Sequence, residues 1–412
     1  MRHLLPPVPD RRDANPCERL SEAEPSPAIS FDLNRDGWIC WPEREDLSLE
    51  FMRLLAAAQD GGATVSECWL TASRIDFADD NSWYREWLRT AAANDARGNA
   101  AATNGNLVTA RNNWLRAINY YQAAAAPLDH APARQQTMLA AMRACAANYL
   151  RHRTPRGEVV SIPWLSDFPL QGYFLPARPA KDPAPVVICI GEPGHRKEEF
   201  LFKLARHAFE REFSLLAVDV LGDGTGASFD DVAGRHKLES AIPSIMDYLV
   251  GRDDVDEGRI AIIGDGWSSS FVARGIAFDH RYAAAVCDGG IWDSHERAFL
   301  KRRSGLSGAV ASPEANRLLR NISCPVLITV GERGWLKTDR VVELSGQPGG
   351  GRRDITLRIF EDAETAAAQG HIDNPTLANE FIFDWIAGRL NAKSQSQGAK
   401  SRSQKFLVTD RL

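Results

Sequence analysis

Residues 260–277 read IAIIGDGWSSSFVARGIA, an apolar run followed by a tight glycine-containing turn and a segment that begins with small residues. The run has the length of a buried strand, and the segment after the turn has the spacing of a helix. Similar apolar runs recur on both sides, and amphipathic segments separate most of them. These runs cover residues 184–194, 213–224, 282–290, 324–334 and 354–362. Continuous Val, Ile and Leu runs in this alternation predict an α/β fold with a mostly parallel, doubly wound sheet.

The chain before this region follows a helical pattern. Apolar residues recur at helical spacing in residues 46–58 and, more regularly, in residues 82–150. Alanine is abundant there and proline occurs only at the breaks, so we expect a small layer of paired helices. The pattern changes near residue 153, and residues 158–177 predict two short strands around a turn.

Composition excludes several classes of protein. The 412 residues carry 49 basic and 54 acidic side chains, which gives a net charge of −5. Such a mildly acidic balance does not indicate binding to nucleic acid or to an anionic membrane. The seven cysteines form no C-x-x-C motif, which gives a zinc site no support and fits a reducing compartment. The first residues lack the apolar region of a signal peptide, and no run reaches the length of a membrane span. We therefore expect a cytoplasmic protein.

The strand, turn and helix of residues 260–277 have the layout of a nucleophile elbow. Such an elbow needs small residues two positions before and two positions after the nucleophile, because strand and helix approach closely. Two registers satisfy this rule. In the first, Gly264 and Ser268 flank Gly266 at the elbow; in the second, Gly266 and Ser270 flank Ser268, which is then the nucleophile.

From about residue 82 to residue 390 the chain resembles the α/β-hydrolases of the dihydroxypseudooxynicotine hydrolase and FrsA-like esterase group. The resemblance rests on five stretches in order and at similar spacing: TARNNWLRAINYYQAA, IPWLSDFPLQGYFLPA, GEPGHRKEEF, VDVLGDGTG and CPVLITVGERG. It implies an α/β-hydrolase core with an N-terminal helical cap. The expected divisions are a poorly ordered segment (1–45), the helical cap (46–152), the α/β-hydrolase core (153–391) and a flexible polar tail (392–412).

The resemblance also implies a Ser–His–Asp triad, from which this chain departs. Aligned on the family, the serine falls on Gly266 and the aspartate falls on Gly334, and only the histidine is present, as His371. A glycine at the elbow removes the backbone strain that any residue with a Cβ would carry there. Without a hydroxyl at that position no acyl-enzyme can form from it.

Three arrangements remain open for the chemistry. Ser268 is the nucleophile if the turn shifts by two residues. Glu332 or Asp288 replaces the missing acid and orients His371. Alternatively, no nucleophile is used, and His371 is a general base beside an oxyanion pocket. The resemblance places that pocket at the backbone N–H groups of Trp267 and Glu192, with His195 near the pocket mouth. Asp265 in the elbow either caps the following helix or enters the pocket.

We therefore expect an enzyme that hydrolyses an ester or C–C bond of a small aromatic, ketone-bearing or ester-bearing molecule. The alternatives are a non-hydrolytic lyase or cyclase that depends on His371, and a catalytically silent protein that binds a ligand. No metal, flavin or nicotinamide site is indicated, and no cofactor is expected. The partner is a small-molecule substrate rather than nucleic acid or membrane, and the resemblance suggests a homodimer.

Overall fold

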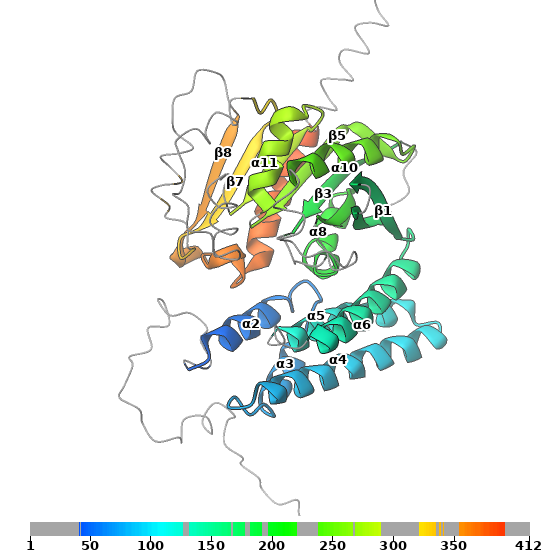
Figure 1. Ribbon diagram of the computed structural model, residues 1–412, viewed down its shortest axis with the longest axis vertical. Coiled ribbons are helices and arrows are strands. Elements are labelled where there is room, and N and C mark those ends of the chain that lie inside the picture. The colour runs from blue at the N-terminus through cyan, green and yellow to red at the C-terminus, as the bar shows by residue number, and fades with distance from the viewer. Residues whose placement is uncertain are drawn as a thin grey trace, which may run out of the picture.

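The structure is a computed structural model in which two layers stack along the long axis, a helical layer and a sheet domain (Figure 1). It describes Trp41, Thr338, Val341 and residues 43–126, 132–165, 168–177, 182–191, 197–220, 238–266, 268–289, 321–334 and 354–391. Predicted features of residues 1–40 and 392–412, including the polar tail, lie outside the described residues.

The helical layer contains α2 to α6. Their bounds are α2 Glu45–Ala56, α3 Val65–Ala72, α4 Asp80–Thr103, α5 Leu107–Ala125 and α6 Pro132–Arg151. Side-chain caps begin two of them: the Thr64 side chain accepts a hydrogen bond from the backbone N of Glu67, and Asp79 accepts one from Asn81. The large aromatic side chains of the layer pack inward, and Trp83, Trp87, Trp114 and Tyr120 are almost completely buried. Burial of this aromatic surface stabilises the layer.

The sheet has eight described strands in the order β1-β2-β4-β3-β5-β6-β7-β8. Their bounds are β1 Glu158–Leu165, β2 Phe168–Leu175, β3 Ala184–Ile190, β4 Ser214–Asp219, β5 Val255–Asp265, β6 Ala284–Asp288, β7 Val326–Gly331 and β8 Ile355–Phe360. β2 pairs antiparallel with β1 and with β4, and the other pairings are parallel. The predicted hairpin and the predicted parallel sheet are both confirmed.

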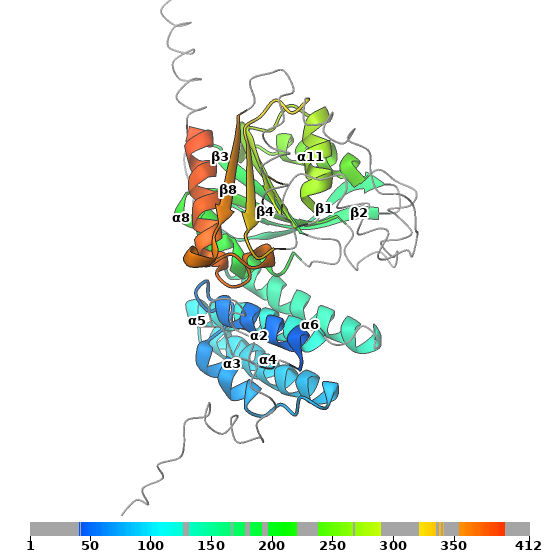
Figure 2. The ribbon, with the colours of Figure 1, turned by 90° about the vertical axis from the view of Figure 1, so that its left-hand side faces the viewer.

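Helices cover both faces of this sheet, as the apolar runs predict (Figure 2). Alternate strand residues point to opposite faces: Val187 and Cys189 join one buried cluster, whereas Val186 and Ile188 join the other. The first cluster includes α7 Phe200–Lys203, α8 Ala205–Glu210, the closing helix at residues 375–391 and the core of the helical layer. The second includes α10 Ala241–Val250 and α11 Ser268–Phe278.

Polar contacts also join the helical layer to the sheet domain. The Thr376 hydroxyl donates to Oδ2 of Asp60 at 2.8 Å, and Nε2 of Gln122 donates to Oε2 of Glu199 at 3.0 Å. The helical layer and the sheet domain are therefore held together by hydrogen bonds as well as by apolar packing. None of the described helices combines the length and the apolarity that crossing a membrane requires.

Candidate active site

The turn between β5 and α11 is the centre of the candidate site. β5 ends at Asp265, Gly266 follows with a φ of 59°, and α11 begins at Ser268. This φ favours glycine, because a Cβ would strain the backbone. Close packing explains Gly264, since a Cβ there would lie 2.8 Å from the Cα of Ser269. The structure thus adopts the first predicted register, with Gly266 at the elbow.

The Ser268 hydroxyl is used in backbone contacts. Its Oγ lies 2.6 Å from the carbonyl oxygen of Ile190 and 3.0 Å from that of Asp265, and the residue is 0% exposed. The single hydroxyl hydrogen is therefore directed at backbone acceptors, and it helps to hold α11 against β3. The second register, with Ser268 as nucleophile, is not the one that this structure adopts.

His371 and Asp288 meet beside the elbow. Asp288 ends β6, lies in register with Asp265 of β5, and its carbonyl oxygen accepts a hydrogen bond from the backbone N of Gly266 at 2.7 Å. Oδ1 of Asp288 lies 2.9 Å from Nε2 of His371 and also accepts the Thr329 hydroxyl at 2.9 Å. Of the two acids proposed to orient His371, Asp288 makes the contact.

The segment after β7, where the resemblance expects the triad aspartate, is built differently. Glu332 is exposed, and its Oε2 accepts a hydrogen bond from the backbone N of Asp362 at 2.9 Å. A Cβ on Gly334 would lie 3.0 Å from Oε1 of Gln369, so a larger side chain has little room there. The expectation that Glu332 pairs with His371 is corrected by the contact that Asp288 makes instead.

A strained loop presents His371. Three non-glycine residues within it have positive φ: Thr365 at 71°, Ala366 at 56° and His371 itself at 56°. The Asp373 carboxylate holds the loop by accepting hydrogen bonds from two backbone N–H groups, those of Ala367 and Ala368. Backbone strain of this kind persists only where surrounding contacts fix it, and it concentrates at functional sites.

Both ring nitrogens of His371 face hydrogen-bond acceptors. Nδ1 lies 2.6 Å from the carbonyl oxygen of Ala366, and Nε2 faces the Asp288 carboxylate. A neutral imidazole has one N–H and leaves one contact without a hydrogen, whereas an imidazolium satisfies both. Burial opposes the charge, but Asp288 outweighs it and raises the pKa of His371 above 6.5. Burial would raise the pKa of Asp288, but His371 holds it below the usual value, so the pair is an imidazolium and a carboxylate.

A second buried ion pair adjoins the first. Nζ of Lys203, at the end of α7, lies 2.8 Å from Oδ2 of Asp265. Burial would lower the pKa of Lys203, but Asp265 and Glu199 raise it, so the ammonium stays charged. Because Asp265 and Asp288 are register partners on adjacent strands, the two pairs form one group of alternating charge.

The sequence analysis did not find Lys203 or Thr329. A signal for Lys203 was present, because it is the single charged residue in the apolar run FLFKL at 200–204. A lysine among buried residues needs a carboxylate partner. Thr329 gives no such signal, since a threonine in a buried strand is common.

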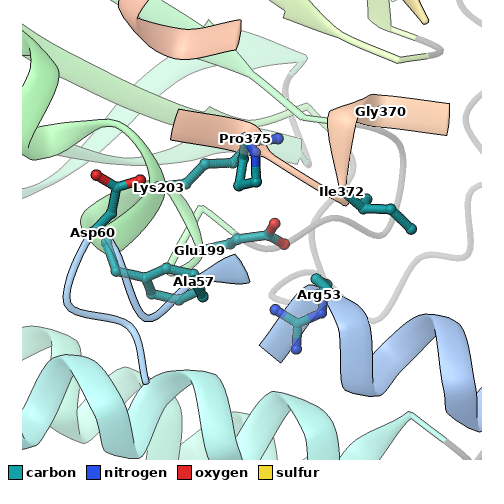
Figure 3. A pocket seen from close by; sticks show the side chains of 9 residues that line it. Arg53, Ala57, Asp60, Glu199, Lys203, Gly370, Ile372 and Pro375 are labelled. Atoms are coloured by element: carbon teal, nitrogen blue, oxygen red, sulfur yellow. The ribbon is translucent and has the colours of Figure 1, made fainter. Parts of the chain in front are cut away.

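A cavity lies between the helical layer and the sheet domain, next to the histidine loop. Arg53 of α2 lines one side, and Glu199 and Lys203 line the other, together with Gly370 and Ile372 on either side of His371 in the sequence. Figure 3 shows these side chains around the space between α2 and the histidine loop. Its free volume is about 30 Å³, room for little more than a water molecule, and neither His371 nor Asp288 is among its lining residues.

Three predicted pocket residues, Glu192, His195 and Trp267, lie outside the described residues, so their expected roles stay predictions. Asp265, expected either to cap the helix or to enter the pocket, pairs with Lys203. Within the described part of the chain, no group of three or more His, Cys, Asp and Glu side chains is arranged to hold a metal ion.

Curated proteins of similar sequence are named hydrolases. The chain is 25% identical over 309 residues to hydrolyase poxO of Penicillium oxalicum, covering 72% of this chain and 68% of that protein. It is 30% identical over 253 residues to a 20-hydroxy-prefusarin hydrolase of Gibberella moniliformis, covering 59% of this chain and 60% of that protein. A scan against models of known protein families finds no match.

Solved structures share the architecture. The 2,6-dihydroxy-pseudo-oxynicotine hydrolase superposes with a TM-score of 0.63 at 16% identity, covering 82% of this chain and 96% of that one. AbyA5 superposes with a TM-score of 0.56 at 15% identity, covering 87% and 99%. Together with the hydrolase names of the sequence relatives, this likeness places the chain in the α/β-hydrolase superfamily.

Proposed function

We propose that this protein is an enzyme that cleaves a small carbonyl-bearing molecule by acid–base chemistry, without a serine acyl-enzyme. One observation carries the proposal: His371, the histidine of the fold, is paired through Nε2 with Asp288, while the elbow position is Gly266. The nitrogen that would take the proton of an elbow serine is thus engaged with a carboxylate. The site keeps its acid–base residue and lacks the nucleophile that this residue would activate.

The two groups of the pair support different parts of the reaction. Among the described residues, the side-chain contacts of Asp288 with Thr329 and with His371 both end on Oδ1. This leaves Oδ2 as the carboxylate oxygen that can accept a proton from an attacking water. The imidazolium of His371 can return a proton to the leaving carbon or oxygen once one of its two ring N–H groups leaves its protein acceptor for the substrate. Water is then consumed and the acyl bond is broken without a covalent intermediate.

The neighbouring Lys203 favours the same type of chemistry. Lys203 is among the residues that line the cavity with Gly370 and Ile372, and its ammonium is held by Asp265. A preorganised cation in a largely buried site stabilises negative charge that develops on a substrate oxygen. We infer that the substrate has a carbonyl group.

The test is a screen of aryl esters and β-diketones with the wild-type chain, followed by two variants on any substrate turned over. His371→Gln is expected to lower kcat by about 10²-fold or more, the usual contribution of a positioned acid–base residue. Ser268→Ala is expected to leave kcat nearly unchanged. A large loss of kcat in Ser268→Ala with little change in His371→Gln would overturn the proposal. If the protein binds these esters or β-diketones but turns none of them over, it is a catalytically silent binding protein instead.

A further inference from the structure

A second cavity lies on another side of the joint between the two layers. It has a volume of about 390 Å³. Arg111 of α5, Tyr149 of α6 and Arg153, just past the end of α6, line the helical side, and Arg206 and Phe209 of α8 line the other. The lining includes three arginines and one aspartate, Asp60, so its formal charge is positive.

Arg153 is buried in this wall, with 7% of its surface exposed. Its guanidinium donates to two backbone carbonyls, those of Pro155 at 3.0 Å and Pro176 at 3.2 Å, and stacks over the Phe209 ring at 3.6 Å. In the described part of the chain no carboxylate lies within ion-pair distance of it. Burial lowers the pKa of Arg153 to about 10, which reflects a charge without a matching counter-ion.

Arg111 adds a second charge of the same sign. Its Nη1 donates to the carbonyl oxygen of His152 at 2.9 Å. The described residues again supply it with no carboxylate, and its proximity contributes to lowering the pKa of Arg153. Two like charges at one cavity repel each other.

One carboxylate, that of Asp60, lines the cavity, and its Oδ1 makes no hydrogen bond with the described residues. Asp60 accepts the Thr376 hydroxyl and lies 3.6 Å from Arg206, and Glu210 lies 2.9 Å from Arg206. These acids balance Arg206 and leave the charges of Arg111 and Arg153 uncompensated. The ligand that fits is an oxyanion, because planar guanidinium groups bind carboxylate and phosphate oxygens through paired N–H donors.

We propose that this cavity is a binding site for a small oxyanion, a phosphate or a carboxylate group, held between Arg111 and Arg153. The site is separate from the His371 pair and does not depend on the function proposed above. Its occupant is a free anion or the charged end of a larger molecule, since the cavity has room for more than one such group.

Isothermal titration of the full-length chain with inorganic phosphate, and separately with acetate, tests this at constant ionic strength in chloride. The informative variant is Arg111→Gln, because Arg153 also ties backbone carbonyls together and its loss would disturb folding. Arg89→Gln is the matched control, a largely exposed arginine of the same helical layer that pairs with Glu86. Arg111→Lys keeps the charge and is expected to retain part of the binding.

Saturable binding of either anion, weakened at least about tenfold in Arg111→Gln and unchanged in Arg89→Gln, would support the site. Stronger binding of phosphate or of acetate then identifies the oxyanion that the site prefers. Equal binding by wild type and Arg111→Gln, or no saturable binding of either anion, would overturn the proposal.

Discussion

Nε2 of His371 lies 2.9 Å from Oδ1 of Asp288, and Asp288 is the residue whose carbonyl oxygen receives the elbow N–H of Gly266. The histidine is therefore joined to the strand next to the elbow rather than to a hydroxyl at the elbow. This contact explains how the site is stable with glycine at that position. It also makes the aspartate of β6 the acid that holds the histidine.

Asp288→Asn is expected to destabilise the protein. Removing one partner of a buried ion pair costs about 3–5 kcal/mol. Without the carboxylate, the His371 ring loses the interaction that favours its charged form and gives up its proton. Urea denaturation at neutral pH measures the change in the free energy of unfolding. Asp384→Asn is the control, because that exposed aspartate pairs with Arg211 at the surface, where an ion pair contributes about 1 kcal/mol or less. Equal losses in the two variants would contradict a buried ionic pair at Asp288.

Ser268→Ala is expected to change stability and not chemistry. The substitution leaves the buried carbonyl of Ile190 without its hydrogen bond, a loss of about 1–3 kcal/mol. A fluorophosphonate probe, which labels activated serines, should modify neither the variant nor the wild type. Intact-mass measurement gives the result directly. An adduct on Ser268 in the wild type would show that the turn reaches the second register in solution.

Gly266→Ser tests whether a hydroxyl alone restores a nucleophile. A residue with a Cβ at a φ of 59° is expected to lose about 1–2 kcal/mol of stability. Because Nε2 of His371 is held by Asp288, the new serine should remain unlabelled by the same probe. Gly266→Ala separates the backbone strain from any effect of the hydroxyl. Rapid labelling of Gly266→Ser would mean that the histidine is free to act on the elbow.

A buried group outside the site predicts a pH dependence of stability. Nζ of Lys197 lies 3.0 Å from Asp219 and 3.5 Å from Glu198, so one lysine serves two carboxylates. Burial and Glu198 outweigh Lys197 and raise the pKa of Asp219 from 3.8 to about 6, a difference worth about 3 kcal/mol. Because the folded state binds the proton more tightly, this stability is present below pH 3.8 and is lost as pH rises through about 6.

Denaturation of wild type and Asp219→Asn between pH 4 and pH 7 measures this effect. The stability of wild type relative to Asp219→Asn should fall by about 2.4 kcal/mol across the range. The exposed Asp384→Asn variant should follow the wild-type profile. Parallel profiles for wild type and Asp219→Asn would show that Asp219 titrates normally in the folded protein.

The fold could be predicted from the sequence because its determinants are local. The run of residues 260–265, the glycines around it and the helix after it specify one strand, one turn and one helix. Gly264 and Gly266 carry most of this information. A glycine at 264 allows the strand and the helix to approach closely, and a glycine at 266 allows a positive φ in the turn. The same pattern of an apolar strand segment followed by a helix recurs along the chain. A parallel sheet with helices on both faces is the arrangement that buries all of these apolar segments.

The site was predicted only in part, because its partners are chosen by tertiary packing. His371 and Asp288 were both named, but Glu332 was an equal candidate until the sheet brought Asp288 to the histidine. Lys203 and Asp265 are 62 residues apart, and nothing local pairs them. The direction of the imidazole ring is set by the strained loop at residues 365–371, which the sequence does not reveal.

The most direct measurement is the protonation state of His371, read from nitrogen NMR of protein labelled in its histidines and assigned with His371→Gln. At pH 7.5 the wild-type ring is expected to be an imidazolium, with protons on both nitrogens and similar shifts for the two. In Asp288→Asn the same ring should become neutral, with widely separated shifts. A neutral wild-type ring with a bare Nε2 at that pH would contradict the pair and return the histidine to the role of a free base.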